Sequence, residues 1–264
     1  MAERILTRRR LLTAGGLSIG GFALSGCDRL SQDRSVRGGL SRAEGLTFAV
    51  QRALIGRHAL AREYSLSDVS PRFPANGTLM PDTDEYQRLL ERKFVDWRLT
   101  IDGLVSRPLS LSLVELMKLP SRTQITRHDC VEGWSAIGQW TGVQLGPLLT
   151  AARLAPGARY LVFHCADNLG GEAYKGGDQS MGRYYESIDL IDAFHPQTIL
   201  AFRLNGAPLD VAHGAPLRLR VERQLGYKHA KYVMRIEAVR SFGHIAGGKG
   251  GYWEDRGYEW YAGI

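Results

Sequence analysis

From residue 97 onward the chain consists of short apolar or alternating runs separated by turn-forming residues, and this pattern limits the possible fold more than any other feature. The run 97–101 ends in Asp102-Gly103, and the run 199–204 turns at Asn205-Gly206. The strand-like runs are 97–101, 123–126, 160–164, 199–204, 217–221 and 231–239. The runs expected to be helical are 46–60, 112–119, 145–152 and 187–193, with 82–92 as a short helix or an extended arm. Many short strands with few short helices predict an α+β fold with a mixed or antiparallel β-sheet and a barrel-like core.

Length and charge restrict the class of protein. With 264 residues and 44% hydrophobic content the chain can bury one sizeable core, so we expect one domain with small appendages. The formal net charge is +7, of which residues 1–26 supply +3 through four arginines and one glutamate. The remaining +4 suits small anionic ligands and gives no support for nucleic-acid binding. The three cysteines, Cys27, Cys130 and Cys165, are too few for a disulfide scaffold.

The amino-terminal segment 1–26 has the features of an export signal. Residues 7–12 form a twin-arginine pattern, and an apolar stretch follows that is short for a membrane span. It ends in Leu24-Ser25-Gly26-Cys27, which is similar to a lipoprotein processing site. We expect cleavage before Cys27 with lipid attachment there, or else an uncleaved anchor. The protein is then expected in the periplasm, exported by the twin-arginine route and anchored at Cys27 to the inner membrane, with residues 27–71 as a tether and N-terminal arm.

The stretch Arg127-His128-Asp129-Cys130-Val131-Glu132 concentrates reactive side chains. It brings a guanidinium, an imidazole, a thiol and two carboxylates together within six residues. A thiolate is both a nucleophile and a ligand for soft metals, and neighbouring cations are expected to lower the pKa of the thiol. The alternative is a buried cysteine at a strand end with ion-paired charges around it.

The residues that follow give this stretch a wider context. Cys130-Val-Glu-Gly-Trp-Ser135 is followed by Gln139-Trp-Thr-Gly-Val143 and then by the expected helix 145–152. This order resembles the molybdenum-cofactor domain of the sulfite oxidase superfamily, and most closely the small bacterial branch that includes methionine-sulfoxide reductase catalytic subunits. The resemblance covers residues 72–242. It implies a sulfite-oxidase-type molybdopterin-binding fold and a molybdenum-dependent oxidoreductase that moves an oxygen atom on a small sulfur-centred substrate, either sulfite or a sulfoxide.

The resemblance also implies a cofactor cradle, built mainly from a second motif in residues 214–231. By position, the implied cofactor contacts are Asn76, Cys130, Cys165, His213, Arg218, His229, Ala230 and Lys231. His213 stands where relatives usually have Asn, and Cys165 stands near where they often have Thr. Cys165 is therefore expected either to touch the cofactor or to fill space on a buried strand.

Cys130 is the metal ligand that the resemblance implies. Its thiolate would add a third sulfur to the two that a single pterin dithiolene provides, with one pterin per chain. Arg127 and His128 flank it and are expected to orient an oxyanion substrate or to move a proton. A disulfide between Cys130 and Cys165 is an alternative in an oxidising compartment, and it would remove the proposed ligand.

Two other functions remain open at this point. One is a zinc or thiol enzyme using His128, Cys130, His164 and Cys165, and the other is a membrane-tethered binding domain without catalysis.

For an oxidoreductase, the sequence has no haem-attachment or iron–sulfur motif, so a separate electron-transfer partner, a cytochrome or membrane haem protein, is expected. The short sequence after the last strand favours a monomer. The Gly/aromatic tail 243–264 is expected to pack on its own domain, to line the mouth of the site or to bind a partner.

Overall fold

The computed structural model describes residues 45–170 and 182–264. The predicted export signal, Cys27, the first part of the tether and most of the Gly-rich excursion after residue 169 lie outside these ranges. The chain divides into two units, 1–55 and 56–264, and in the first of them residues 45–54 are helical. Within the described ranges, every helix is too short or too polar to cross a bilayer.

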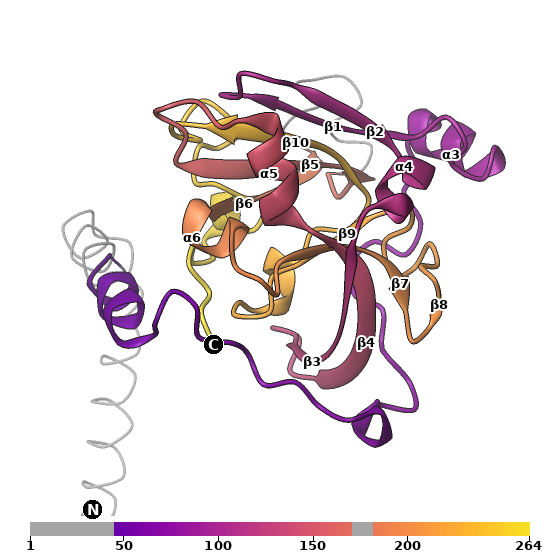
Figure 1. Cartoon of the computed structure of the whole chain (residues 1–264), viewed down its shortest axis with the longest axis horizontal. Coiled ribbons are helices and arrows are strands. Elements are labelled where there is room, and N and C mark those ends of the chain that lie inside the picture. Colours follow the sequence, from indigo (N-terminus) through magenta and orange to yellow (C-terminus); the bar gives the residue numbers. More distant parts are fainter. Residues whose placement is uncertain (1–44, 171–181) are drawn as a thin grey trace, which may run out of the picture. The chain divides into compact units, whose positions relative to one another are not determined.

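The second unit contains two five-stranded sheets (Figure 1). The first sheet has the order β2-β1-β10-β5-β6. Its strands are β1 (Arg98–Gly103), β2 (Leu109–Ser112), β5 (Tyr160–Asn168), β6 (Arg183–Asp189) and β10 (Val233–Val239). β1 and β10 are parallel and the other neighbours are antiparallel, so this sheet is mixed.

The second sheet has the order β3-β4-β7-β8, with β9 pairing β7. Its strands are β3 (Ser121–Asp129), β4 (Ser135–Gln144), β7 (Ile199–Leu204), β8 (Ala207–Pro208) and β9 (Arg218–Arg220). The α+β prediction is confirmed, but the expected barrel-like core is wrong, because both sheets stay open. The chain repeatedly passes from one sheet to the other, which produces two packed layers and not a single sheet closed on itself.

The helices are short and lie in the connections. They are α3 (Asp84–Glu91), α4 (Leu113–Lys118), α5 (Leu145–Ala152) and α6 (Leu190–Ala193), with 3₁₀ turns η1 (Leu66–Asp68), η4 (Gly226–Lys228) and η5 (Glu254–Arg256). The predicted helix 187–193 is half wrong, since β6 continues to Asp189. Asp189 is the N-cap of α6. Its carboxylate accepts a hydrogen bond from the Asp192 backbone N–H, and the helix begins at the next residue, Leu190.

The hydrophobic core lies between the two sheets. Its largest cluster combines Leu99 and Phe163 of the first sheet with Leu200 and Leu219 of the second, and α5 adds Leu149. A smaller cluster around Phe73 and Trp140 packs elsewhere on the second sheet. Residues 56–83, which include the last part of the expected tether, run along the β3–β4 hairpin, where the Tyr64 N–H donates to the Ile125 carbonyl. This course brings Asn76 to the end of the hairpin that carries Cys130.

Candidate active site

A cavity of about 280 Å³ opens beside the loop that joins β3 to β4. Its walls come from the N-terminal arm, the hairpin loop, the ends of β5, β6 and β9, η4 with the residues that follow it, and the C-terminal segment. The lining residues are Asn76, Gly77, Thr78, Cys130, Val131, Glu132, Asp167, Leu169, Tyr184, Arg218, Gly226, Tyr227, His229, Lys231, Trp253 and Tyr258. The structure therefore brings five of the predicted site residues to one cavity: Asn76, Cys130, Arg218, His229 and Lys231.

Cys130 occupies a tight turn at the end of β3. Its N–H donates to the Trp134 carbonyl and its carbonyl accepts from the Gly133 N–H, while Gly133 takes the positive φ of 91° that this turn requires. The Asn76 amide donates to the Cys130 sulfur at 3.9 Å. Burial raises the pKa of the thiol and outweighs Arg218 and the Asn76 bond, which lower it. A neighbouring cation, Arg218, thus lowers the pKa as expected, but burial outweighs it, and Arg127 lies on the exposed side of β3.

Arg127 and His128 point to opposite sides of β3, as successive residues of a strand do. Arg127 is exposed and pairs with Asp129 at 3.0 Å. His128 is buried, and its Nδ1 accepts a hydrogen bond from Arg220 at 2.9 Å. Neither residue lines the cavity, although both were predicted to act on substrate.

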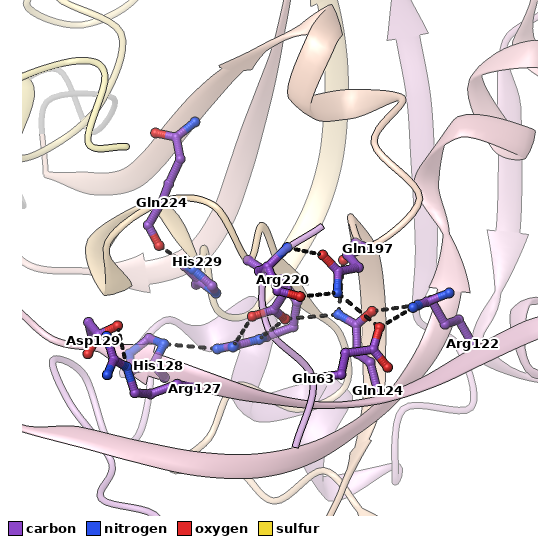
Figure 2. A network of polar contacts seen from close by, with 12 residues as sticks. Glu63, Arg122, Gln124, Arg127, His128, Asp129, Gln197, Arg220, Gln224 and His229 are labelled. Carbon is purple, nitrogen blue, oxygen red and sulfur yellow. Dashed lines mark hydrogen bonds and ion pairs between the residues drawn. The ribbon is translucent and has the colours of Figure 1, made fainter. Parts of the chain in front are cut away.

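A buried polar network stands behind His128 (Figure 2). Arg220 forms an ion pair with Glu222, and Gln124 also donates to Glu222. Through Gln124 the network reaches Gln197, and beyond it Glu63 and Arg122. Burial and the Arg220 charge lower the pKa of His128 well below its usual range. Because Arg220 can only donate, the neutral imidazole carries its proton on Nε2, so this network fixes one tautomer of His128.

Arg218 and His229 present unsatisfied polar atoms at the cavity. Arg218 is fully buried, and its Nη1 donates to the His213 carbonyl at 3.2 Å, but Nε and Nη2 have no partner among the described residues. Burial lowers its pKa to about 9, with Arg220 as the next cause. The His229 Nε2 bonds the Gln224 carbonyl at 3.0 Å, which leaves Nδ1 as an acceptor, likewise without a described partner (Figure 2). Buried donors and acceptors of this kind are costly unless a ligand satisfies them.

Lys231 differs from Arg218 because its ammonium group is already satisfied. Nζ donates to the carbonyls of Asn76 and Ala212 at 2.7 and 2.8 Å, and to that of Thr78. An ammonium has three N–H donors, so these three carbonyls use them all. Burial, followed by the Arg218 charge, lowers the pKa of Lys231 to about 7. Lys231 therefore ties the arm segment 76–78 to the cavity wall.

The other predicted cofactor contacts do not line this cavity. His213 bonds Asp210 at 2.7 Å and the Phe73 carbonyl at 3.0 Å, while Ala230 is buried behind the wall. Cys165 borders a neighbouring cavity of about 320 Å³, and its thiol lies 3.8 Å from the Phe163 carbonyl. Cys130 and Cys165 are both free thiols.

The zinc alternative receives no support from the described part of the chain. Within it, His, Cys, Asp and Glu side chains form no group of three that could hold a metal ion. His164 instead bonds Glu237 at 2.9 Å on the first sheet, while His128 lies behind the cavity wall and bonds Arg220.

Several lining residues were missed from the sequence. Asp167 lines the cavity with its Oδ1 buried and without a described partner, and burial raises its pKa to about 6. The strand alternation that buries Cys165 was a signal for Asp167 two residues later. Trp253 and Tyr258 come from the Gly/aromatic tail, so the tail both packs on its own domain and lines the mouth.

The cavity residues fit a molybdenum–pterin cofactor. The site offers a soft sulfur at Cys130, a cation with two unused donors at Arg218, and unused acceptors at Asn76 Oδ1, Asp167 Oδ1 and His229 Nδ1. Its ligand must therefore carry both an anionic or acceptor group and several donors. A phosphorylated pterin bearing a sulfur-ligated metal has this combination.

Comparison with known proteins gives the same assignment. The family model described as "Oxidoreductase molybdopterin binding domain" matches residues 87–242. The chain is 36% identical over 255 residues to YedZ1 of Azospira oryzae, named as a candidate protein-methionine-sulfoxide reductase subunit, which covers 97% of this chain and 86% of that protein. It is also 36% identical over 168 residues to MsrP of Xanthomonas axonopodis pv. citri, a protein-methionine-sulfoxide reductase catalytic subunit.

The shared regions differ in extent. The match to MsrP covers 62% of this chain and 51% of the relative, so the chain spans about half its length. The crystal structure of the sulfane dehydrogenase SoxCD from Paracoccus pantotrophus is similar with a TM-score of 0.47 and 25% identity, over 56% of this chain and 39% of that one. On the family match and the full-length similarity to YedZ1, the chain belongs to the molybdopterin-binding oxidoreductases of the sulfite oxidase superfamily.

Proposed function

We propose that this chain reduces uncharged sulfoxides, with the balance R₂SO + 2e⁻ + 2H⁺ → R₂S + H₂O. The observation that carries this choice is the mouth of the cavity. Aromatic and apolar side chains from Val131, Trp253 and Tyr258 line it, together with the exposed carboxylate of Glu132. A neutral sulfoxide with apolar arms suits such a mouth, whereas a sulfite anion would meet the Glu132 charge. The names of YedZ1 and MsrP support the same substrate class.

The cofactor we propose is one molybdenum-bearing pterin per chain. When bound, it supplies the two-electron oxygen-atom-transfer chemistry. Cys130 would ligate the metal through its thiolate, and Arg218 would donate through Nε and Nη2 to an anionic group of the cofactor. Asn76 and His229 would accept hydrogen bonds from it, while Lys231 keeps the Asn76 segment in place.

We further propose that the electrons come from a separate haem-containing subunit, and that the chain itself is a periplasmic monomer. The names of YedZ1 and MsrP describe a subunit and a catalytic subunit, which supports a separate partner subunit. Such a partner fits a chain whose described cavity opens at the surface beside the exposed Tyr258.

Metal analysis and two assays test this function. The purified protein should contain molybdenum and pterin in equal amounts. It should oxidise a reduced viologen dye when methionine sulfoxide is added, and it should reduce ferricyanide with sulfite far more slowly. Sulfite oxidation faster than sulfoxide reduction, or zinc in place of molybdenum, would contradict the proposal.

A further inference from the structure

The C-terminal segment is built into the wall of the cavity. The Tyr252 N–H donates to the Tyr185 carbonyl at 2.9 Å, which aligns the segment with β6. Just beyond it, the rings of Trp253 and Tyr258 stack at 5.4 Å, and the ring of Tyr227 from η4 meets Tyr258 edge-on at 5.2 Å. All three rings line the cavity, so the tail and η4 form one aromatic wall.

A buried ion cluster joins this wall to the rest of the fold. Lys228 of η4 donates to Glu186 of β6 at 2.5 Å and to Glu254 of η5 at 2.6 Å, and all three side chains are buried. Gly251 packs so closely that a Cβ there would lie within 1.9 Å of Glu254. The cluster therefore fixes Glu254, which lies next to Trp253 in the chain.

The charges in the cluster are unusual for a purely stabilising contact. One ammonium faces two carboxyl groups, and the Glu186 and Glu254 carboxyl groups also hydrogen-bond each other, which requires a proton on one of them. Burial, followed by the Glu254 charge, raises the pKa of Glu186, so one carboxyl group retains its proton. Burying three ionisable groups in this way contributes little net stability, which points to a role in positioning.

We propose that the Lys228–Glu186–Glu254 cluster positions the C-terminal segment so that Trp253 and Tyr258 contact the sulfoxide substrate at the mouth of the cavity. This inference rests on the proposed function, and it names the residues that select the substrate. Methyl and methylene groups pack favourably on aromatic rings, so these rings would bind the apolar arms of the sulfoxide. The cluster itself does not touch the substrate and acts only through the tail.

The test uses two substitutions of Glu254 in the metal-loaded enzyme. Glu254→Ala removes a partner of Lys228, and we expect KM for methionine sulfoxide to rise about tenfold with kcat changed less than about twofold. Glu254→Gln keeps an oxygen for Lys228 and mimics a protonated carboxyl group, so KM should stay within about twofold of the wild type. Trypsin should cleave after the exposed Arg256 faster in the alanine variant only, while molybdenum content stays unchanged in both.

A neighbouring acid provides the matched control. Asp255 lies beside Glu254 but bonds Tyr185 and the N–H groups of Gly247 and Lys249, away from the cavity. Asp255→Asn should therefore leave KM unchanged. If Glu254→Ala fails to fold, the double variant Trp253→Ala and Tyr258→Ala, with the cluster intact, should raise KM in the same way.

The outcomes separate the two proposals. If Glu254→Ala is cleaved faster at Arg256 but its KM is unchanged, the inference is overturned. It is also overturned if Glu254→Ala and Glu254→Gln lose kcat and molybdenum to the same extent. An unchanged KM in the double variant would also overturn it. A wild-type enzyme without sulfoxide activity would refute the proposed function instead, and the cleavage experiment would still report whether the cluster holds the tail.

Discussion

At the scale of single residues, the two buried thiols have different surroundings. Cys130 lines the cavity beside the Asn76 amide, whereas Cys165 lies on β5, borders the neighbouring cavity, and has its thiol near the Phe163 carbonyl. Cys130→Ala should therefore fold and keep much of its pterin, but lose turnover and one sulfur ligand of the metal. Cys165→Ala should cost about 1 kcal/mol of stability and leave the metal's sulfur ligands intact. X-ray absorption counts these ligands, and a sulfur lost only from the Cys165 variant would reverse the assignment.

Arg218 and Lys231 are both buried cations at the cavity. Of the two, Arg218 has nitrogen atoms without a hydrogen-bond partner among the described residues, whereas the Lys231 ammonium donates to three carbonyls. Arg218→Gln should lower pterin and molybdenum content together, because each charge-assisted bond contributes about 1.5–3 kcal/mol. Lys231→Met should instead destabilise the cofactor-free protein by about 3 kcal/mol, since three carbonyls lose their donor. Metal analysis and urea unfolding distinguish the two variants. A cofactor loss confined to Lys231→Met would show that the roles are exchanged.

Asp167 predicts a pH dependence of stability. Burial raises its pKa from 3.8 to about 6, although a hydrogen bond with Thr78 and the Lys231 charge act in the opposite direction. The folded state thus favours the protonated carboxyl group. The stability it contributes is complete below about pH 4 and is lost as the pH rises through 6, by about 3 kcal/mol in total.

Asp167→Asn removes this titration. In the cofactor-free protein the variant should match the wild type at pH 4 and exceed its free energy of unfolding by about 3 kcal/mol at pH 8. Urea unfolding at both pH values measures the difference. Equal pH profiles for the two proteins would show that Asp167 does not titrate in this range.

At the scale of elements, the sequence predicts strands best where a largely apolar run is followed by turn-forming or polar residues. The runs 160–164 and 199–204 lie within β5 and β7, but β4 was missed because its two glycines and Trp140 resemble a turn. The cavity was predicted where motifs supply its residues, as for Cys130 and His229. Lining residues such as Asp167 and Trp253 were not predicted, because they reach the cavity only when segments distant in the sequence pack together. A local sequence pattern does not indicate which strands and tail segments become neighbours.

The turn η4 depends on a close approach that only glycine permits. A Cβ on Gly226 would lie 2.5 Å from Nε2 of His128, and Arg220 prevents that ring from moving away. Gly226→Ala should therefore cost about 1–3 kcal/mol and disturb the cavity wall. Gly243→Ala is the control, because nothing lies within 4 Å of its added Cβ, and its effect should stay within about 0.5 kcal/mol. Equal urea midpoints for the two variants would contradict the packing seen at η4.

At the scale of the whole molecule, the site is assembled from nearly the full length of the second unit. The arm brings Asn76, the hairpin brings Cys130, β9 brings Arg218, the residue after η4 is His229, and the tail brings Trp253. Its proposed cofactor would contact segments far apart in the sequence, so cofactor binding and folding of this unit should be coupled. We propose that the chain is loaded with cofactor before export, which would connect the site with the segment 1–26 predicted to be an export signal.

The last prediction concerns export. The twin-arginine pattern at Arg8 and Arg9 motivates the proposal that the chain crosses the membrane already folded around its cofactor. Replacing both by Lys keeps the charge but removes the pattern, so the full-length precursor should accumulate in the cytoplasm with molybdenum bound. Arg4→Lys, outside the pair, serves as the control and should be exported normally. Cell fractionation with metal analysis of the precursor measures both effects, and normal export of the double variant would show that another route carries the chain.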